Sequence, residues 1–343
     1  MKAPIFTSIF ASLLFMLGSC TSNPTGIRAT GTAYEIIVVA DQSTWNNNVG
    51  SVLKEQLLAP VSGLPAPENA MRVTYVQPVN FKGMFMYVRN ILVVTIDDSQ
   101  FSKVSLQSER NRWAQGQVVV YLNAPDESMM YDFLNDHQKT IVDFFTKVEM
   151  RRMAEVLQTA YSKVVMDKLM EKFDIMLYAP TDIKSLANDS IPDFFWASNN
   201  ANTGRMDLVV YTFPYTDPNT FTREYLLEKR NAVLGAYIPG SLPNSYMSTN
   251  SAMVTYTPIT LYGKYCGVLR GLWETEGDMM GGPFVSFARL DEVNNRVIVA
   301  EGFVFSPETD KKNYMRRLEA SLHTLRLPDE INQTLEGPAI NEE

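Results

Sequence analysis

The sequence predicts an α+β protein with two units of similar size, in which helices cover mostly antiparallel sheets. Three observations lead to this prediction. Short β-branched apolar runs recur in both halves of the chain, and turn signals between neighbouring runs in the second half favour hairpins. Helical patterns close each half. The 343 residues, 45% of them hydrophobic, are enough to form more than one core.

The first unit is predicted over residues 33–172. Its opening strand spans residues 34–40, a β-branched run that ends at Asp41. Residues 45–58 have helical spacing, and Pro60 stops that helix. Three more strands follow in this unit, at residues 72–78, 90–96 and 117–122.

A long or bent helix is predicted after the first sheet, because neither Gly nor Pro occurs between Pro125 and Pro180. Asp126 is a good N-cap, and apolar residues then recur at steps of three and four. One helix over residues 127–172 would be about 70 Å long at 1.5 Å per residue, which exceeds a domain diameter. We therefore expect a bend or break near residues 149–152. Packing on the preceding sheet is the favoured interpretation, with an intermolecular coiled coil as the alternative.

The second unit is predicted over residues 173–327. The pattern indicates seven strands and two helices. The strands are predicted at residues 173–180, 194–198, 206–213, 252–261, 265–275 and 283–290, with a seventh hairpin partner at 296–305. The helices are predicted at residues 220–234 and 308–325. Asn294 and Asn295 suit a tight turn between the last two strands.

Residues 1–19 have the pattern of a signal peptide. Lys2 gives a positive start, and the apolar run over residues 5–17 is too short to remain as a membrane-spanning helix. Residues 17–20, Leu-Gly-Ser-Cys, resemble the lipobox of bacterial lipoproteins. This resemblance implies cleavage before Cys20 and attachment of fatty acyl groups such as palmitate to it. The alternative is an ordinary secretory signal followed by a cysteine that is there by chance.

The predicted anchor implies a location and a partner. Several acyl chains hold a protein stably on a membrane, at about 0.8 kcal/mol per buried methylene. Thr21 and Ser22 follow the cysteine, whereas aspartate there would indicate retention at the inner membrane in the enterobacterial sorting rule. We therefore expect the periplasmic face of the outer membrane. Residues 20–32 are predicted to be a flexible tether and residues 328–343 a disordered tail.

Composition excludes several classes of function. The formal net charge is −8, so a nucleic acid partner is not expected. Cys266 is the only cysteine besides Cys20, so no disulfide forms within the mature chain. His137 and His323 lack metal-ligand spacing, and no dinucleotide or phosphate-binding fingerprint occurs. We therefore predict no cofactor, no metal and no recognisable catalytic residue.

Two segments are candidates for a binding surface. In the first, Trp196 is followed closely by Asn199 and Asn200, and an indole beside amide groups is common in sugar sites. A core tryptophan before an Asn-rich turn would give the same pattern.

The second segment combines aromatic, basic and acidic residues. They are Arg270, Trp273, Glu274, Glu276 and Asp278. Carboxylates at this spacing could bind Ca²⁺ or act as the acid and base of a glycosidase. A solvated acidic loop between two strands is the alternative interpretation.

A possible modification site lies just before the first of these segments. Asp189-Ser190-Ile191 resembles the periplasmic O-glycosylation motif of Bacteroidota, which would place the sugar on Ser190.

Several segments together resemble an uncharacterised family of Bacteroidota lipoproteins that has only a domain of unknown function. They lie at residues 34–39, 63–65, 193–196 (Asp-Phe-Phe-Trp), 280–286 (Met-Gly-Gly-Pro-Phe-Val-Ser) and 301–304 (Glu-Gly-Phe-Val). The resemblance implies a location but no activity. The sequence thus predicts a non-catalytic cell-envelope lipoprotein that binds a protein or glycan, with a carboxylate-dependent periplasmic hydrolase as the alternative.

Overall fold

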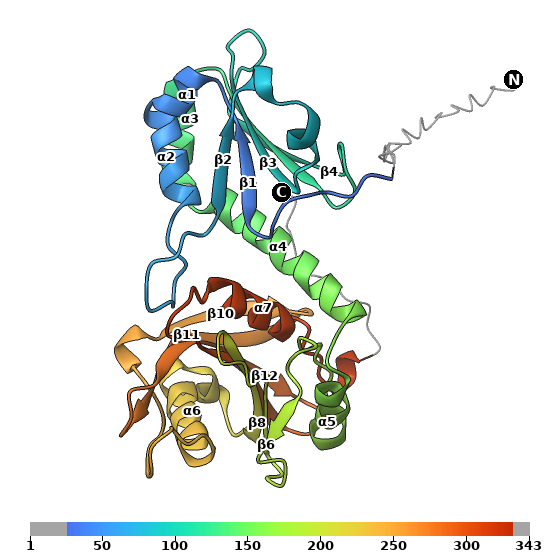
Figure 1. The fold of residues 1–343 in the computed structure, drawn as a ribbon, viewed down its shortest axis with the longest axis vertical. Helices are drawn as coiled ribbons and strands as arrows, with labels where there is room; N and C mark the ends of the chain where they lie inside the picture. The colour runs from blue at the N-terminus through green and yellow to red at the C-terminus, as the bar shows by residue number, and fades with distance from the viewer. Residues whose placement is uncertain (1–25, 332–343) are drawn as a thin grey trace, which may run out of the picture.

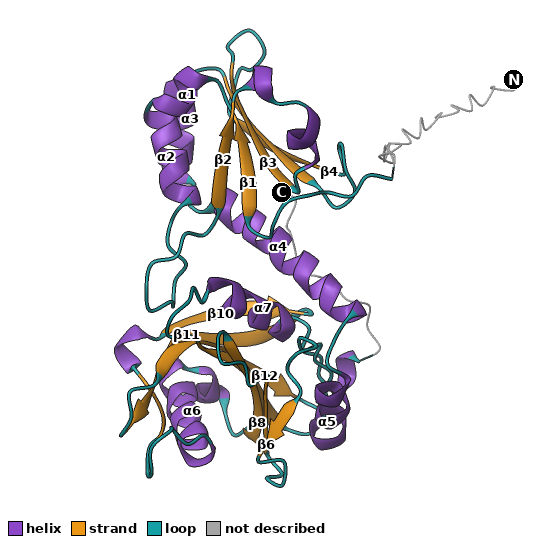
Figure 2. Ribbon diagram, viewed as in Figure 1, coloured by secondary structure: helices purple, strands orange, loops and turns teal. Residues whose placement is uncertain are grey.

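The computed structural model describes residues 26–331, in which two domains are joined by one long helix (Figure 1). The class is α+β, as predicted, with the helices and strands shown in Figure 2. The first domain contains five strands and the helices that follow them along the chain. Its strands are β1 (Glu35–Val39), β2 (Arg72–Val76), β3 (Asn90–Ile96), β4 (Ser105–Arg110) and β5 (Val118–Ala124). Its first two helices are α1 (Gln42–Asn46) and α2 (Asn48–Leu57).

The first sheet is mixed, with strand order β2-β1-β3-β5-β4. The pairs β1–β2, β1–β3 and β3–β5 are parallel, and only β4–β5 is antiparallel among the described strands of this sheet. Parallel strands need crossover connections, which α1 and α2 supply between β1 and β2. The expectation of mostly antiparallel pairing therefore holds for the second sheet but not for this one.

Three helices follow the first sheet: α3 (Glu127–Asp136), α4 (Thr140–Thr159) and α5 (Lys163–Phe173). The helix α4 is the long helix that the sequence predicts, but the expected break near residues 149–152 is wrong. The helical run is interrupted at residues 137–139 and 160–162 instead. Ser162 starts α5 because its hydroxyl accepts a hydrogen bond from the Val165 backbone N–H at 3.5 Å.

The helix α4 packs against both domains (Figure 1). Its first half buries Ile141, Phe145 and Val148 in the core between the first sheet and its helices. Its second half buries Leu157 against Ala320 of α7 (Lys312–Leu322), a helix of the second domain. The apolar residues that recur along α4 therefore pack against other parts of the same chain.

The second domain is built on an antiparallel sheet with strand order β10-β11-β12-β13-β8-β7-β6. The strands along this path are β6 (Ser185–Ala187), β7 (Phe194–Ser198), β8 (Arg205–Pro214), β10 (Thr255–Leu261), β11 (Lys264–Glu276), β12 (Gly281–Asp291) and β13 (Arg296–Phe305). A further strand, β9 (Tyr246–Thr249), pairs with the end of β11. The turn at Asn295 has φ of 49°, the left-handed conformation that the sequence predicts there.

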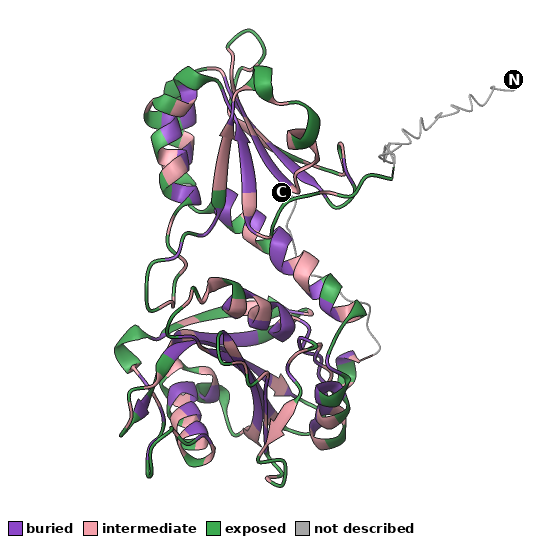
Figure 3. Cartoon of the chain, viewed as in Figure 1, coloured by how far each residue is buried: buried purple, intermediate pink, exposed green. Residues whose placement is uncertain are grey.

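Both faces of this sheet are covered, so β12 and β13 are buried almost throughout (Figure 3). The helices α5 and α7 contribute to the core on one face. The helix α6 (Arg223–Tyr237) covers the other face together with the short 3₁₀ helix η3 (Pro218–Phe221). The two cavities described below lie beside the two ends of α6.

The domains dock through the start of α7. The Glu68 carboxylate, which belongs to the first domain, accepts hydrogen bonds from the backbone N–H groups of Lys311 (2.7 Å) and Lys312 (2.9 Å). Arg316 donates to the Ala70 carbonyl at 2.9 Å, and its guanidinium lies 3.5 Å from the centroid of the Tyr34 ring. Both contacts are buried, which fixes α7 against the first domain.

Three expectations about the chain need correction. Residues 173–180 are not a strand: Ile175, Leu177 and Ala179 are buried, but Met176 forms only an isolated bridge to Arg326 among the described residues. Part of the predicted tether is attached to the first domain, since residues 28 and 30 form bridges there. Pro328–Glu330, within the predicted tail, forms a 3₁₀ helix, η5.

The last of these corrections has a clear physical cause. Glu330 is fully buried and pairs with Arg289, which is also fully buried. Removing the first residues of the predicted tail from the fold would leave that arginine without its counter-charge. Residues 20–25 of the predicted tether, Cys20 among them, and residues 332–343 of the tail lie outside the described residues. Within residues 26–331, no helix is long and apolar enough to cross a membrane.

Candidate functional site

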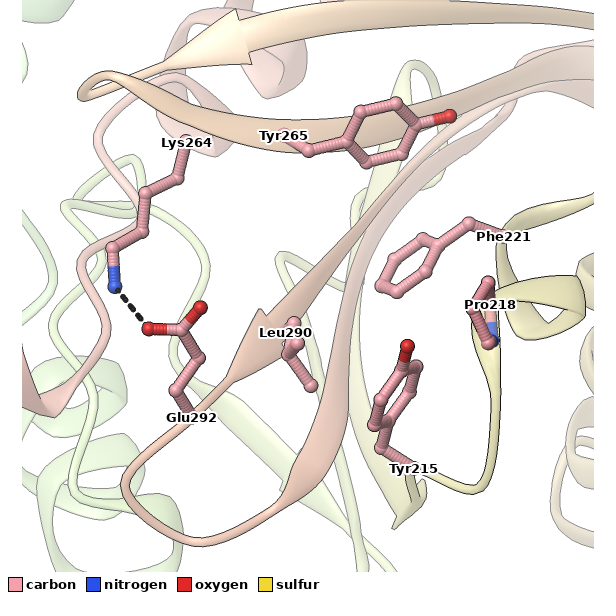
Figure 4. Close-up of a pocket in the computed structure, with 7 residues that line it drawn as sticks. All are labelled: Tyr215, Pro218, Phe221, Lys264, Tyr265, Leu290 and Glu292. Carbon is pink, nitrogen blue, oxygen red and sulfur yellow. Dashed lines mark hydrogen bonds and ion pairs between the residues drawn. The ribbon is translucent and has the colours of Figure 1, made fainter.

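An open hollow lies beside the start of α6, and we call it the aromatic hollow (Figure 4). Its volume is about 520 Å³, within the range of about 300–1,000 Å³ that is usual for ligand pockets. Three segments of the second domain contribute its lining. The lining residues are Tyr215, Pro218, Phe221, Lys264, Tyr265, Leu290 and Glu292.

The aromatic side chains of the hollow are held by local structure and by one another. Asp217 accepts a hydrogen bond from the Asn219 N–H at 2.7 Å, which starts η3 and fixes Phe221 at its end. The Phe221 ring meets Tyr265 edge to face at 5.4 Å and lies 6.2 Å from Tyr215. The Tyr256 hydroxyl donates to the Phe221 carbonyl at 2.8 Å and therefore accepts from the Tyr265 hydroxyl at 2.5 Å. The rings are therefore positioned before any ligand arrives.

The charged groups beside the hollow pair with one another. The Lys264 ammonium lies 3.3 Å from Glu292, as Figure 4 shows, and 2.5 Å from Asp329. The bond to Asp329, with help from Glu292, raises the pKa of Lys264, so this side chain stays charged. The site thus combines aromatic and aliphatic side chains with the paired charges of Lys264 and Glu292.

A second, smaller cavity lies beside the end of α6, and we call it the narrow pocket. Its volume is about 130 Å³. Aromatic rings make up much of its wall, and one acidic and one basic side chain join them. The lining residues are Trp196, Arg205, Asp207, Ile238, Pro239, Gly240, Ser241, Met247, Trp273, Thr275, Met280, Phe303 and Phe305.

Asp207 is the polar centre of the narrow pocket. Its side chain is fully buried, and Oδ1 accepts hydrogen bonds from Trp196 Nε1 and Arg205 Nη2, both at 2.9 Å. Burial raises the pKa of this carboxyl above its usual range, and the Arg205 guanidinium opposes the shift. Two buried atoms, Asp207 Oδ2 and Arg205 Nε, have no hydrogen-bond partner within residues 26–331.

The structure brings together only two of the residues predicted for the binding surface, Trp196 and Trp273. Both line the narrow pocket, although 77 positions separate them. Trp273 is buried, and its indole donates to the Val304 carbonyl at 3.2 Å. Asn199 instead accepts from the Met206 N–H at 2.9 Å, and Asn200 has φ of 49°. These two asparagines therefore build a turn, which was the alternative interpretation of this segment.

The acidic residues and Arg270 have separate structural roles. Glu274 and Glu276 are exposed on β11, and neither lines the aromatic hollow or the narrow pocket as the described residues form them. Asp278 accepts from both the backbone N–H and the hydroxyl of Ser241 at 2.6 Å. Arg270 pairs with Glu319 of α7. No described group of three or more acidic, His or Cys side chains is placed to hold a metal.

The remaining single residues lie as follows. Ser190 is exposed in the loop between β6 and β7, where a modifying enzyme could reach it. Cys266 is buried, and this burial raises the pKa of its thiol to about 12, far above that of a reactive cysteine. His137 and His323 lie at the C-terminal ends of α3 and α7.

Sequence reasoning missed the aromatic hollow because Tyr265 is far along the chain from Tyr215 and Phe221, and no motif links the two segments. The only local signal is Asp217-Pro218, which the sequence uses as a helix start. Arg205 and Asp207 were missed as well, although charged residues two apart in an otherwise apolar strand are an observable anomaly.

The two domains match two different family models. Residues 29–158 match a domain of unknown function, DUF8532, and residues 162–324 match another, DUF4837. Domains of unknown function thus cover most of the chain, in agreement with the resemblance described above. The boundary between them falls where α4 ends and α5 begins. No curated protein matches this chain.

Proposed function

We propose that this chain is a non-catalytic binding module, anchored by lipid on Cys20 at the periplasmic face of the outer membrane, and that it binds a neutral glycan through the aromatic hollow. The observation that carries the proposal is the grouping of Tyr215, Phe221 and Tyr265 around one apolar floor. No activity has been assigned to either domain type, so the proposal depends on the chemistry of the site.

The chemistry of the hollow favours a carbohydrate over other ligands. A sugar ring has an apolar C–H face that packs on aromatic rings, and hydroxyls at its edge that need polar partners. The hollow supplies the rings of Tyr215, Phe221 and Tyr265 and the hydroxyl of Tyr215, which points toward Phe221 in Figure 4. Lys264 already pairs with two carboxylates, Glu292 and Asp329, which disfavours a ligand with a net negative charge. A protein partner is the other outcome that the test below can return.

The first test is the removal of one ring. Tyr265 is 48% exposed but packs on Phe221 and bonds to Tyr256, so Tyr265→Ala should lower stability by about 1–2 kcal/mol and leave the domain folded. Glycan binding should weaken about three- to tenfold, because one aromatic contact contributes about 0.5–1.5 kcal/mol. Isothermal titration with the neutral oligosaccharide selected on a glycan array measures the change.

A matched control is available for this variant. Tyr131 lies on α3 of the first domain and is 40% exposed, so Tyr131→Ala should bind as the wild type does. If no neutral glycan binds the wild type, or if Tyr131→Ala loses as much affinity as Tyr265→Ala, the proposal is wrong. Binding only to envelope proteins would assign the hollow to a protein partner.

The second test concerns the anchor, which is supported by the lipobox-like residues 17–20. The protein purified from its native membrane should have an intact mass that corresponds to a chain beginning at Cys20 with acyl groups added. In detergent phase separation, Cys20→Ala should move from the detergent phase to the aqueous phase. Cys266→Ala is the control and should stay with the detergent. A Cys20→Ala protein that still partitions into detergent would exclude the lipid anchor.

A further inference from the structure

The two faces of the first sheet are covered unequally. Neighbouring residues of β1 point to opposite faces, and Val38 lies in the large core that α2, α3 and α4 cover. Val39, on the other face, belongs to a small cluster in which no residue comes from an α-helix. Residues 78–88 contribute to that cluster, and they include the 3₁₀ helices η1 (Pro78–Asn80) and η2 (Gly83–Tyr87). We call this side of the sheet the thin face.

Residues 78–88 also place apolar side chains on the outside of the thin face. Phe81 and Phe85 pack on the buried cluster, whereas Val79 is 74% exposed and Met84 is 78% exposed. Lys82 lies between these two in the sequence and is exposed as well. Exposed apolar side chains beside a lysine are typical of a segment that rests in the interfacial region of a bilayer.

The described chain begins at this same face. The backbone N–H of Thr30 donates to the Tyr87 carbonyl at 2.8 Å, and the N–H of Gln115 donates to the Ile27 carbonyl at 2.8 Å. Figure 1 shows this first stretch on the side of the first domain that is away from α1, α2 and α3. Residues 26–30 are therefore attached beside the thin face.

The chain between the proposed lipid and this attachment is short. Cys20 and Gly26 are six residues apart, and at about 3.5 Å per residue such a chain reaches at most about 21 Å. The first family match is 130 residues long, and a domain of that size has a radius of gyration of about 14 Å, which corresponds to a diameter of about 36 Å. Because the chain is shorter than the domain it holds, the domain cannot turn its helical face to the membrane.

The charges at the thin face suit an anionic lipid surface. The formal net charge of the whole chain is −8. Arg28, which forms a bridge to Gln115, and Lys82 are nevertheless both exposed on this side. Cationic side chains near a membrane are attracted to anionic headgroups. Their long apolar stems also let them keep the charge in water while neighbouring side chains enter the interface.

We propose that the thin face lies against a phospholipid bilayer with anionic headgroups, and that Val79 and Met84 enter its interfacial region. The helices α1, α2 and α3 then face away from the membrane. Because the reach of the chain depends on lipid at Cys20, this orientation rests on the proposed function.

A fluorescent label on single introduced cysteines tests the orientation. Cys20 would be acylated and Cys266 is buried, so the introduced thiol is the one that reacts. The lipidated full chain is reconstituted in vesicles of phosphatidylethanolamine and phosphatidylglycerol. A matched set of vesicles also contains a lipid that carries a nitroxide at the boundary between headgroup and acyl chain, where it quenches nearby labels.

The labelled variants are Met84→Cys and Val79→Cys, with Met129→Cys and Met279→Cys as controls. Met129 lies on α3, on the helical face of the same sheet, and Met279 is fully exposed in the second domain. We expect the nitroxide to quench about half of the emission at Met84 and Val79, since interfacial groups lie within about 5–10 Å of that boundary. The controls should be quenched little. Equal quenching at Met84 and Met129, or none at Met84, would overturn the proposal.

Failure of the anchor gives a different result from failure of the orientation. A wild-type chain that takes up label at Cys20 and does not sediment with vesicles would exclude the lipid, and this orientation with it. A wild-type chain that sediments with vesicles while Met84→Cys stays unquenched would exclude the orientation alone.

A pair of substitutions tests the apolar contacts, with the label on Asn80→Cys, an exposed position in the same segment. Val79→Asp combined with Met84→Asp should reduce the quenching about threefold, because carboxylates resist leaving water and are repelled by anionic headgroups. The fold should persist, since both side chains are exposed. Met129→Asp combined with Met279→Asp is the matched control and should leave the quenching unchanged. Equal quenching in the two double variants would contradict insertion.

Discussion

Replacing Arg230 with methionine should destabilise the second domain by about 3–5 kcal/mol, because it leaves the Glu301 carboxylate buried without a counter-charge. Both side chains are fully buried between α6 and the sheet. The guanidinium donates to both oxygens of Glu301, at 2.9 and 2.7 Å, and lies 3.8 Å from the Phe284 ring centroid. Urea unfolding followed by circular dichroism measures the loss.

The loss in Arg230→Met should depend on pH. Burial raises the pKa of Glu301, and the charge and hydrogen bonds of Arg230 oppose this shift. Without Arg230, the pKa of Glu301 should therefore rise further. A carboxyl whose folded pKa lies above its unfolded value takes up a proton on folding, so stability rises as the pH falls. The deficit should therefore be smaller at pH 5 than at pH 8. A deficit that grows on acidification would contradict this account.

Two further variants compare the stability lost when one charge of the pair is left without a partner with the stability lost when both charges are removed. Arg230→Met combined with Glu301→Leu should recover much of the lost stability, since well-packed apolar pairs often replace buried ion pairs. Lys163→Met is the control, because Lys163 and Asp167 form an exposed pair on α5. That change should stay within about 0.5 kcal/mol. A double variant as unstable as Arg230→Met would mean that the site requires the charges themselves.

The second large effect is expected in α4. Val148 is 3% exposed in the core of the first domain, so Val148→Asp should cost several kcal/mol and unfold that domain. Val156, on the same helix, is 62% exposed, and Val156→Asp should change stability by less than about 0.5 kcal/mol. Thermal unfolding together with gel filtration measures both. A Val148→Asp protein that remains folded but changes from oligomer to monomer would show that the seam joins separate chains.

The elements that the sequence predicts well are those whose local pattern decides their structure. The strand at residues 296–305 has the predicted bounds, because an apolar run follows an Asn-rich turn. The strand β4 was missed, since its residues are polar and lie at the edge of the first sheet. The order of that sheet also depends on which distant strands pair, and periodicity carries no information about this.

The candidate sites show the same division. Tryptophans are large and few, so Trp196 and Trp273 could be selected from the sequence and do line one cavity. The spacing of Glu274, Glu276 and Asp278 suggested shared chemistry, yet the first two are exposed and the third binds Ser241. Arg205 Nε and Asp207 Oδ2 are buried without a hydrogen-bond partner among the described residues, and only the folded structure shows their burial.

The contact between Glu68 and the start of α7 affects how far the two halves can be treated as separable modules. The N–H groups of Lys311 and Lys312 at this end of α7 have their partner in Glu68, which is 243 and 244 positions earlier in the chain. A fragment cut between the two family matches, at residues 159–161, would lack that partner and would also expose Ala320 and the buried end of α4. The halves match different family models but share buried contacts, so they should be expressed, mutated and exchanged between relatives as a pair.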